Sequence, residues 1–278
     1  MKSKDPLIII DWHNLLFAAW FASQKDISVK PWAPLLRLMQ DIELATITAN
    51  SGLVVIAGES KKKLKRSYIN PTYKQNRKKH TNDDFGRFKK DAEMLVNLLW
   101  LDVLRVSGAE ADDVIASIVK QSQDKFEKIY VYSRDKDLYQ LLSFDNVNIY
   151  KGYGKIYSQN DFINQFKFSP RSYIHYKSFV GDPSDGVQGV MNWGPAKTTA
   201  AIQDGSIEKI IFENFDEYNR AYQLLSLDYD LKLPQYIGSR FTICIEDVEA
   251  SLRKRFSEEA VVDLLFYMRR FINRTFNT

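Results

Sequence analysis

The run Leu7-Ile8-Ile9-Ile10-Asp11 decides the fold class, because four apolar residues without alternation are followed at once by a carboxylate. Such a run is typical of a strand that is buried on both faces, as the strands of a parallel sheet are. Helix-like patterns follow at 92–99 and 111–120, and the alternation of strands and helices predicts an open α/β sheet. In such sheets, ligands bind beyond the carboxyl ends of the strands. We therefore expect Asp11 at a ligand-binding edge.

Further acidic residues stand at or near the ends of apolar runs. They are Glu59, Glu110, Asp112, Asp113, Asp135, Asp137, Asp182 and Asp185. An Asp after a strand is often a turn former or a helix N-cap, and for each residue alone that interpretation stays open. Gathered together, these carboxylates would repel one another unless a cation lay between them. Because hard divalent cations prefer oxygen ligands, the pattern predicts a metal site and metal-assisted phosphate chemistry.

The composition excludes several classes of protein. The chain has 278 residues and is 45% hydrophobic, enough for one large domain or two smaller ones. Its single cysteine, Cys244, excludes an intramolecular disulfide and fits a reducing compartment, so we expect a cytoplasmic location. Three His and one Cys argue against a zinc site. No apolar segment is long enough to cross a bilayer, and no membrane partner is expected.

The positive charge of the chain is concentrated in one segment. Residues 61–90 hold twelve Lys or Arg and two acidic residues, although the net charge of the whole chain is only +4. Aromatic residues are interleaved with these cations: Tyr68, Tyr73, Phe85 and Phe88. Cations with stacking platforms favour single-stranded nucleic acid, since they neutralise phosphates and stack on bases. The alternative is a solvated loop that becomes ordered only on binding.

A second candidate for phosphate binding lies in the glycine-rich stretch 186–199. A turn that opens a helix through Gly194-Pro195 presents backbone N–H groups to an anion, and Lys197 would reinforce it. In a nucleic-acid enzyme, this would be a backbone clamp that reads no sequence. The alternative is an ordinary turn with proline at the first helical position.

These motifs in combination resemble the 5′-nuclease family, which includes flap endonucleases, phage exonucleases and RNase H, and the 5′→3′ exonuclease domain of bacterial DNA polymerase I. Asp11 to Asn14 is similar to the family's opening element, and 73–77 to its Tyr-Lys-x-Asn-Arg motif. The segments 108–113, 133–138 and 181–198 resemble its acidic signatures and helix-hairpin-helix. Trp12, His13, Glu59 and Gly186 depart from the usual pattern, but none of them removes a carboxylate.

The resemblance implies a central mostly parallel sheet with flanking helices, as in PIN and 5′-nuclease folds. Residues 1–168 would form the α/β nuclease domain with a basic helical arch at about 61–95. Residues 169–278 would form a helical DNA-binding region with the helix-hairpin-helix at about 186–203.

The resemblance also implies two Mg²⁺ or Mn²⁺ ions. We expect one ion at Asp11, Glu59, Glu110, Asp112 and Asp135, and the other at Asp113, Asp137, Asp182 and Asp185. Lys74 and Arg77 would hold the scissile phosphate, with Asp11 and Asp135 central to catalysis. The expected nucleic-acid contacts are Tyr73, Lys74, Arg77, Lys78, Lys79, Arg87, Gly189, Gly194, Lys197 and Thr198. K⁺ is expected at the helix-hairpin-helix, as in relatives.

The expected activity is that of a 5′→3′ exonuclease and structure-specific flap endonuclease, removing RNA primers or flaps during phage-type DNA replication. Its substrates would be 5′-flap, nicked or gapped DNA and RNA–DNA hybrids, and the protein would act as a monomer. The motifs leave open the preference between exonuclease and flap-endonuclease action, and between RNA and DNA. Two alternatives from other classes are a branched-DNA-binding protein without turnover and a PIN-type ribonuclease.

Overall fold

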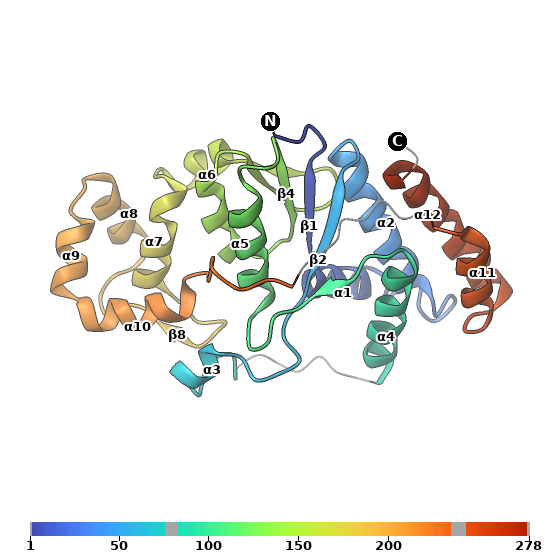
Figure 1. The fold of residues 1–278 in the computed structure, drawn as a ribbon. Coiled ribbons are helices and arrows are strands. Elements are labelled where there is room, and N and C mark those ends of the chain that lie inside the picture. Colours follow the sequence, from blue (N-terminus) through green and yellow to red (C-terminus); the bar gives the residue numbers. More distant parts are fainter. Residues whose placement is uncertain (1, 76–82, 235–242, 277–278) are drawn as a thin grey trace.

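A six-stranded sheet forms the centre of the molecule (Figure 1). The computed structural model describes residues 2–75, 83–234 and 243–276. The strands are β1 (Leu7–Asp11), β2 (Leu53–Ala57), β3 (Val103–Leu104), β4 (Ile129–Tyr132), β5 (Val147–Tyr150) and β6 (Ile156–Tyr157). Their order is β3-β2-β1-β4-β5-β6, and every neighbouring pair is parallel except β5 and β6. The predicted mostly parallel sheet is confirmed.

Strand β1 is buried on both faces because its side chains point alternately into two apolar cores. Ile8 and Ile10 belong to one core, together with residues of α1 (Trp12–Ala22), α2 (Ala33–Thr48) and α4 (Asp83–Leu98). Leu7 and Ile9 belong to the other, together with α5 (Ala111–Ser122) and the 3₁₀ helix η1 (Asp137–Ser143). This two-sided burial explains why the run at 7–10 lacks polar alternation.

Successive strands are added first on one side of β1 and then on the other, so the order of the strands switches at β1. It moves from β1 outward through β2 to β3, then crosses back and places β4 on the other side of β1. In open parallel sheets, such a switch point leaves a crevice beyond the carboxyl ends of the two central strands. Asp11 ends β1, and residues 133–137 directly follow β4, so the topology itself brings these acidic residues together.

The helices after residue 168 gather at two opposite ends of the sheet, not in one region (Figure 1). At one end lie α7 (Tyr173–Val180), α8 (Pro195–Gln203), α9 (Ile207–Glu213) and α10 (Phe215–Leu225), next to α6 (Gln159–Phe166) and η2 (Pro170–Ser172). At the other end, α11 (Ile245–Arg253) and α12 (Glu258–Phe276) contribute Leu252 and Leu264 to the core that contains α2. The expected helical region 169–278 is therefore divided.

The basic segment is partly built into the fold. It contains α3 (Arg66–Ile69) and the first half of α4, while 76–82 lies outside the described residues. Phe85 and Phe88 are only 4% and 5% exposed; in the core, Phe88 stacks with the Trp20 ring and Phe85 meets that ring edge-on. The expectation that they serve as stacking platforms for bases was wrong, because α4 buries its apolar face against α1 and α2. Tyr68, in contrast, is exposed beside Lys63.

A membrane-spanning helix is not found within the described residues, since none of their helices is both long and apolar enough.

Candidate active site

The site begins where β1 and β4 end side by side. Asp11 caps the N-terminus of α1, and its carboxylate accepts hydrogen bonds from the Asn14 backbone N–H (3.1 Å) and the Ser133 hydroxyl (2.9 Å). Ser133 Oγ in turn accepts from the backbone N–H of Asp135 (3.1 Å). Burial raises the pKa of Asp11 to about 6, and the nearby Asp135 charge adds to this. The fold therefore holds Asp11 where its charged form is disfavoured.

Asp112 shares this electrostatic environment from the first turn of α5. Burial raises its pKa well above the usual value, and the charges of Asp135 and Asp11 raise it further. A cavity of about 160 Å³ is lined by Asp11, Glu59, Glu110, Asp112 and Asp135, together with His13 and Lys74. The five carboxylates expected around the first metal ion therefore all line one cavity.

Two of the acidic residues at the start of α5 are held by a buried arginine. Arg66 donates to both oxygens of Asp113 (2.6 and 2.7 Å), to Glu110 Oε2 (2.5 Å) and to the carbonyl oxygen of Ser226 (2.6 Å). The backbone N–H of Asp228 donates to Asp113 as well (3.0 Å). Asp113 was expected as a ligand of the second metal ion, but both its oxygens bind this guanidinium and, unlike Glu110, it does not line the acidic cavity.

Arg66 was missed as a site residue because it lies within a run of solvent-exposed lysines. Its side chain is 9% exposed, whereas that of the adjacent Lys65 is 63% exposed. No local pattern separates the two residues. The partners of Arg66 lie 44 to 160 positions further along the chain, and only the fold brings them within reach.

Lys74 enters the cavity from the loop after α3. It has a left-handed backbone conformation (φ 59°), and its N–H donates to the carbonyl oxygen of Asp185 (2.9 Å). Its ammonium group contacts Glu110 Oε1 and lies 3.8 Å from Asp185 Oδ2. Burial alone would raise the pKa of Glu110, but the charges of Lys74 and Arg66 outweigh it and lower that pKa. Lys74 thus provides a positive charge among the carboxylates.

Tyr73 connects the two sides of the site. Its ring is buried against Val187 and Leu224, and its hydroxyl, with one proton to donate, lies within hydrogen-bond distance of Glu110 (3.1 Å) and Asp185 (3.4 Å). Because Tyr73 is 6% exposed, it does not offer a stacking surface to nucleic acid, and its expected role as a direct contact was wrong. Its position indicates a residue that orients the loop carrying Lys74.

The remaining acidic residues, Asp137 and Asp182, lie on either side of a partly buried cation, Lys177 of α7. Its ammonium group lies 2.8 Å from Asp137 Oδ1 and 2.5 Å from Asp182 Oδ2. Burial raises the pKa of Asp137 to about 6, although the charge of Lys177 works in the opposite direction. Burial would also raise the pKa of Asp182, but hydrogen bonds from Lys177 and Ser184 lower it. Sequence reasoning missed Lys177, because α7 carries no motif of its own.

The donor set at this edge suits a hard divalent cation. It consists of carboxylates: burial raises the pKa values of Asp11, Asp112 and Asp137, and repulsion from the Asp135 charge adds to each. Within the described ranges, no three acidic, His or Cys side chains already stand at metal-coordinating positions. Lys74 and Lys177 lie among the carboxylates instead. The residues fit a metal ion in chemistry and location, and binding would draw the carboxylates together.

The expected nucleic-acid contacts of the second half lie on and around the turn between α7 and α8. This turn contains the short strands β7 (Gly181–Asp182) and β8 (Val187–Gln188). Gly189 is required there, because a Cβ would lie 2.2 Å from the carbonyl oxygen of Phe179. Gly194 caps α8, and Lys197 rests on the Trp193 ring, 3.9 Å from its centroid.

Two expected nucleic-acid contacts, one in α8 and one in α4, have partners within the protein. Thr198 is fully buried, and its hydroxyl donates to the Gly194 carbonyl oxygen (3.0 Å), so it cannot reach a nucleic acid. Arg87 is exposed on α4 and pairs with Asp84 (2.8 Å). The expected contacts Arg77, Lys78 and Lys79 lie outside the described residues.

With this geometry established, comparison with known families identifies the chain. A family model described as the 5′-3′ exonuclease N-terminal resolvase-like domain matches residues 6–167, more than half of the sequence. The chain belongs to this family. The match extends from β1 to the end of α6 and includes every candidate carboxylate except Asp182 and Asp185. The family resemblance inferred from the sequence motifs is confirmed.

Among individual members of the 5′-3′ exonuclease family, similarity extends along most of the chain. The thermostable DNA polymerase I of Thermus thermophilus is 28% identical over 271 residues, which cover 91% of this chain and 32% of that protein. The chain therefore spans about a third of the length of that polymerase. A 5′-3′ exonuclease of Mycoplasma pneumoniae is 29% identical over 275 residues, which cover 93% of this chain and 94% of that protein.

The fold of this family member also resembles solved structures. A T5 flap endonuclease, determined in a pseudo-enzyme–product complex with DNA and metal ions, matches with a TM-score of 0.66. The two are 19% identical, and the match covers 96% of this chain and 99% of the other. At that identity, the likeness confirms the fold class.

Proposed function

We propose that this chain is a divalent-metal-dependent 5′ nuclease, which hydrolyses phosphodiesters near 5′ ends and branch points. One observation carries the proposal: Asp11, Asp112 and Asp135 from three separate segments line a single cavity with Lys74. An acidic cavity with one inward-pointing cation suits a phosphodiester whose charge is shared between metal ions and a lysine. Relatives named 5′-3′ exonuclease and flap endonuclease support the same activity.

The residues of the site would have separate roles in binding metal, binding phosphate and orienting carboxylates. One Mg²⁺ or Mn²⁺ ion would be held by Asp11, Glu59, Glu110, Asp112 and Asp135. A second ion would be held by Asp137, Asp182 and Asp185. Bound at these carboxylates, such ions neutralise the phosphate and make water a better nucleophile. Lys74 would contact the non-bridging oxygens of the reacting phosphate, a role shared with Arg77. Ser133 fixes the orientation of the Asp11 carboxylate through its 2.9 Å hydrogen bond.

The substrate class follows from the surroundings of this cavity. The segment 61–90 carries a large excess of Lys and Arg and contains Lys74, so a 5′ strand would approach along it. The turn between α7 and α8 would hold duplex backbone through Lys197, with K⁺ as a bound cation. We therefore propose 5′-flap, nicked or gapped DNA and RNA–DNA hybrids as substrates of a monomeric, cytoplasmic enzyme.

Cleavage of end-labelled substrates tests the proposal. Flap, nicked and RNA-primed duplexes are incubated with the protein in Mg²⁺ and in EDTA, with blunt duplex of the same sequence as the control. We expect Mg²⁺-dependent products cut near the 5′ end or the branch, and none in EDTA. Binding without cleavage at any Mg²⁺ concentration would instead favour a branched-DNA-binding protein. Cleavage of single-stranded RNA alone would favour a PIN-type ribonuclease.

A further inference from the structure

A segment after α10, residues 226–231, contains no helix or strand but is fixed in place along α5 (Figure 1). We call this segment the strap. Leu227 and Leu231 of the strap are buried in the core that contains α5 and η1. Because both leucines are buried, the strap is part of the packed fold and not a loose connection between helices. It lies outside residues 6–167, which the family model matches.

One face of α5 holds the strap through polar side chains at intervals of three or four residues. These side chains belong to Asp113, Ser117, Lys120 and Gln121. The fully buried Ser117 hydroxyl donates to the Asp228 carbonyl oxygen (2.9 Å) and accepts from the Leu231 N–H (3.1 Å). At the exposed edge of this face, Lys120 binds the Asp230 carboxylate (2.7 Å). Gln121 donates to the Leu231 carbonyl oxygen there as well (3.2 Å). Ser117 is therefore the central attachment of the strap to α5.

Two backbone groups of the strap reach the candidate active site. The Ser226 carbonyl oxygen accepts from Arg66 Nη2 (2.6 Å). The Asp228 N–H donates to Asp113 Oδ1 (3.0 Å). Arg66 Nη1 also donates to Glu110 Oε2 (2.5 Å), and Glu110 lines the acidic cavity of the site. Because both strap groups belong to the main chain, the position of the strap, and not the identity of its side chains, decides whether these bonds form.

The strap completes the surroundings of a buried pair of charges. The side chains of Arg66 and Asp113 are only 9% and 8% exposed, so the protein itself must satisfy their remaining donors and acceptors. The strap supplies one acceptor to the guanidinium and one donor to the carboxylate. If the strap were displaced, both bonds would be lost. The Arg66 guanidinium would then no longer be fixed in the orientation in which it binds Glu110.

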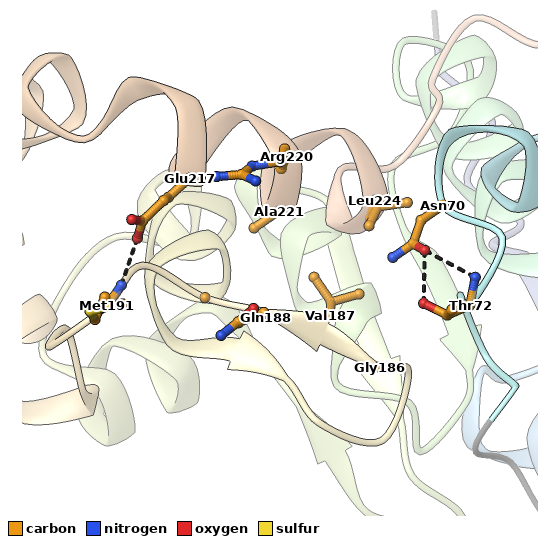
Figure 2. A pocket seen from close by; sticks show the side chains of 11 residues that line it. Asn70, Thr72, Gly186, Val187, Gln188, Met191, Glu217, Arg220, Ala221 and Leu224 are labelled. Carbon is orange, nitrogen blue, oxygen red and sulfur yellow. Dashed lines mark hydrogen bonds between the residues drawn. The ribbon is translucent and has the colours of Figure 1, made fainter.

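The start of the strap is fixed next to the loop that carries Lys74. Figure 2 shows Leu224, near the end of α10, beside Asn70 and Thr72 of that loop, and all three residues line one cavity. Leu224 also shares a small apolar cluster with Tyr73, which directly precedes Lys74. The strap thus begins beside one active-site loop and continues along the helix that carries further site residues, so it connects the two.

We propose that the strap is a positioning element of the active site and that Ser117 is the residue that holds it in place. In this position the strap orients Arg66 and Asp113, and through Arg66 it orients the Glu110 carboxylate for the metal ion. The inference rests on the proposed function, which supplies the metal ion. Residues outside the part of the chain that the family model matches would then complete the metal site.

Paired substitutions in the full chain test this assignment. Ser117→Ala, Arg66→Lys and the double variant are unfolded with urea in EDTA, so that neither metal nor catalysis enters the measurement. Each single change should raise the equilibrium constant of unfolding by about tenfold, because it removes bonds to the strap. The double variant should show clearly less than the product of the two effects, since either change alone releases the shared strap.

Ser23→Ala is the matched control, because the Ser23 hydroxyl is also buried but donates to the Ala19 carbonyl oxygen of α1 (2.8 Å). Its effect on unfolding should multiply fully with that of Arg66→Lys. Gln121→Ala removes one strap bond at the exposed edge of α5 and is a milder form of the Ser117 variant. Combined with Arg66→Lys, it should also fall short of the product of the single effects.

Calorimetric titration with Mn²⁺ measures the effect of the strap on the metal site. Ser117→Ala should weaken Mn²⁺ binding by about tenfold, as is common when a residue behind a metal ligand is changed, whereas Ser23→Ala should leave it unchanged. Effects of Ser117→Ala and Arg66→Lys that multiply fully, or wild-type Mn²⁺ affinity in Ser117→Ala, would overturn the proposal. Coupled effects in a protein that binds no Mn²⁺ would support the strap as a positioning element and contradict only the proposed nuclease function.

Discussion

The backbone N–H of Lys74 donates to the main-chain carbonyl oxygen of Asp185 across 111 residues of sequence, at 2.9 Å. This bond joins the loop after α3 to the turn after α7 and places the Lys74 ammonium group among Glu110 and Asp185. Since the side chain of Lys74 is 15% exposed, its charge is directed into the site and away from bulk solvent. A group in this position is suited to stabilise charge that develops on a reacting phosphate.

Replacing Lys74 by alanine should therefore slow the chemical step. We expect a decrease of about 10²- to 10³-fold in the single-turnover rate at saturating enzyme, as is common when one charge-stabilising group is lost. Lys62→Ala, at an exposed position of the same segment, should instead cause a mild binding defect that depends on salt. An unchanged single-turnover rate for Lys74→Ala would reduce this residue to a general phosphate contact.

Arg66 should act as a positioning residue for Glu110 and Asp113. Arg66→Lys keeps the charge but loses the fork that binds both residues, so we expect weaker Mg²⁺ affinity with nearly normal binding of flap DNA in EDTA. Arg66→Met should destabilise the fold by about 3–5 kcal/mol, because it leaves a buried carboxylate unpaired. Lys65→Ala, next to it but exposed, is the control and should change neither property. An equal Mg²⁺ affinity for wild type and Arg66→Lys would contradict the positioning role of Arg66.

Lys177 should stabilise the metal-free protein. Lys177→Met removes the cation shared by Asp137 and Asp182, and we expect a loss of about 3 kcal/mol in the free energy of unfolding without metal. Because a divalent ion can neutralise the same carboxylates, Mg²⁺ should recover part of this loss. The measurement is urea unfolding in EDTA and in Mg²⁺, with Lys209→Ala as the control. A loss that Mg²⁺ does not reduce would argue against a cation site there.

The raised pKa of Asp11 predicts a specific pH dependence. Its folded pKa of about 6 lies above the ordinary value of 3.8, so the folded state binds more protons between these pH values. Without metal, the Asp11 charge should therefore destabilise wild type relative to Asp11→Asn by up to about 3 kcal/mol above pH 6. This difference should shrink as the pH falls from 6 to 4. A difference that is constant with pH would contradict the pKa shift.

The sequence predicts the sheet and its acidic edge better than it predicts the basic side chains that lie among the carboxylates. Asp11 and Asp135 follow runs of buried residues, and local periodicity is enough to place the ends of parallel strands on one edge. Arg66 and Lys177 could not be recognised, because each is defined by partners that only the fold brings near. Phe85 and Phe88 were misassigned, although their spacing with Ala92, Leu95 and Leu99 is the 3.6-residue period of a buried helix face.

The most direct test of the account is a Mg²⁺ titration of single-turnover cleavage on a labelled 5′-flap substrate, comparing wild type with Asp135→Asn and Asp137→Asn. Burial is the main cause of the raised pKa values of Asp11, Asp112 and Asp137, and the charge of Asp135 adds to each of them, so Asp135 lies close to both groups of carboxylates. We predict Mg²⁺-dependent cleavage by wild type, and its loss in both variants, which still bind the flap. Near-normal, Mg²⁺-dependent turnover by the double variant Asp135→Asn/Asp137→Asn would contradict the assignment of this edge as the catalytic metal site.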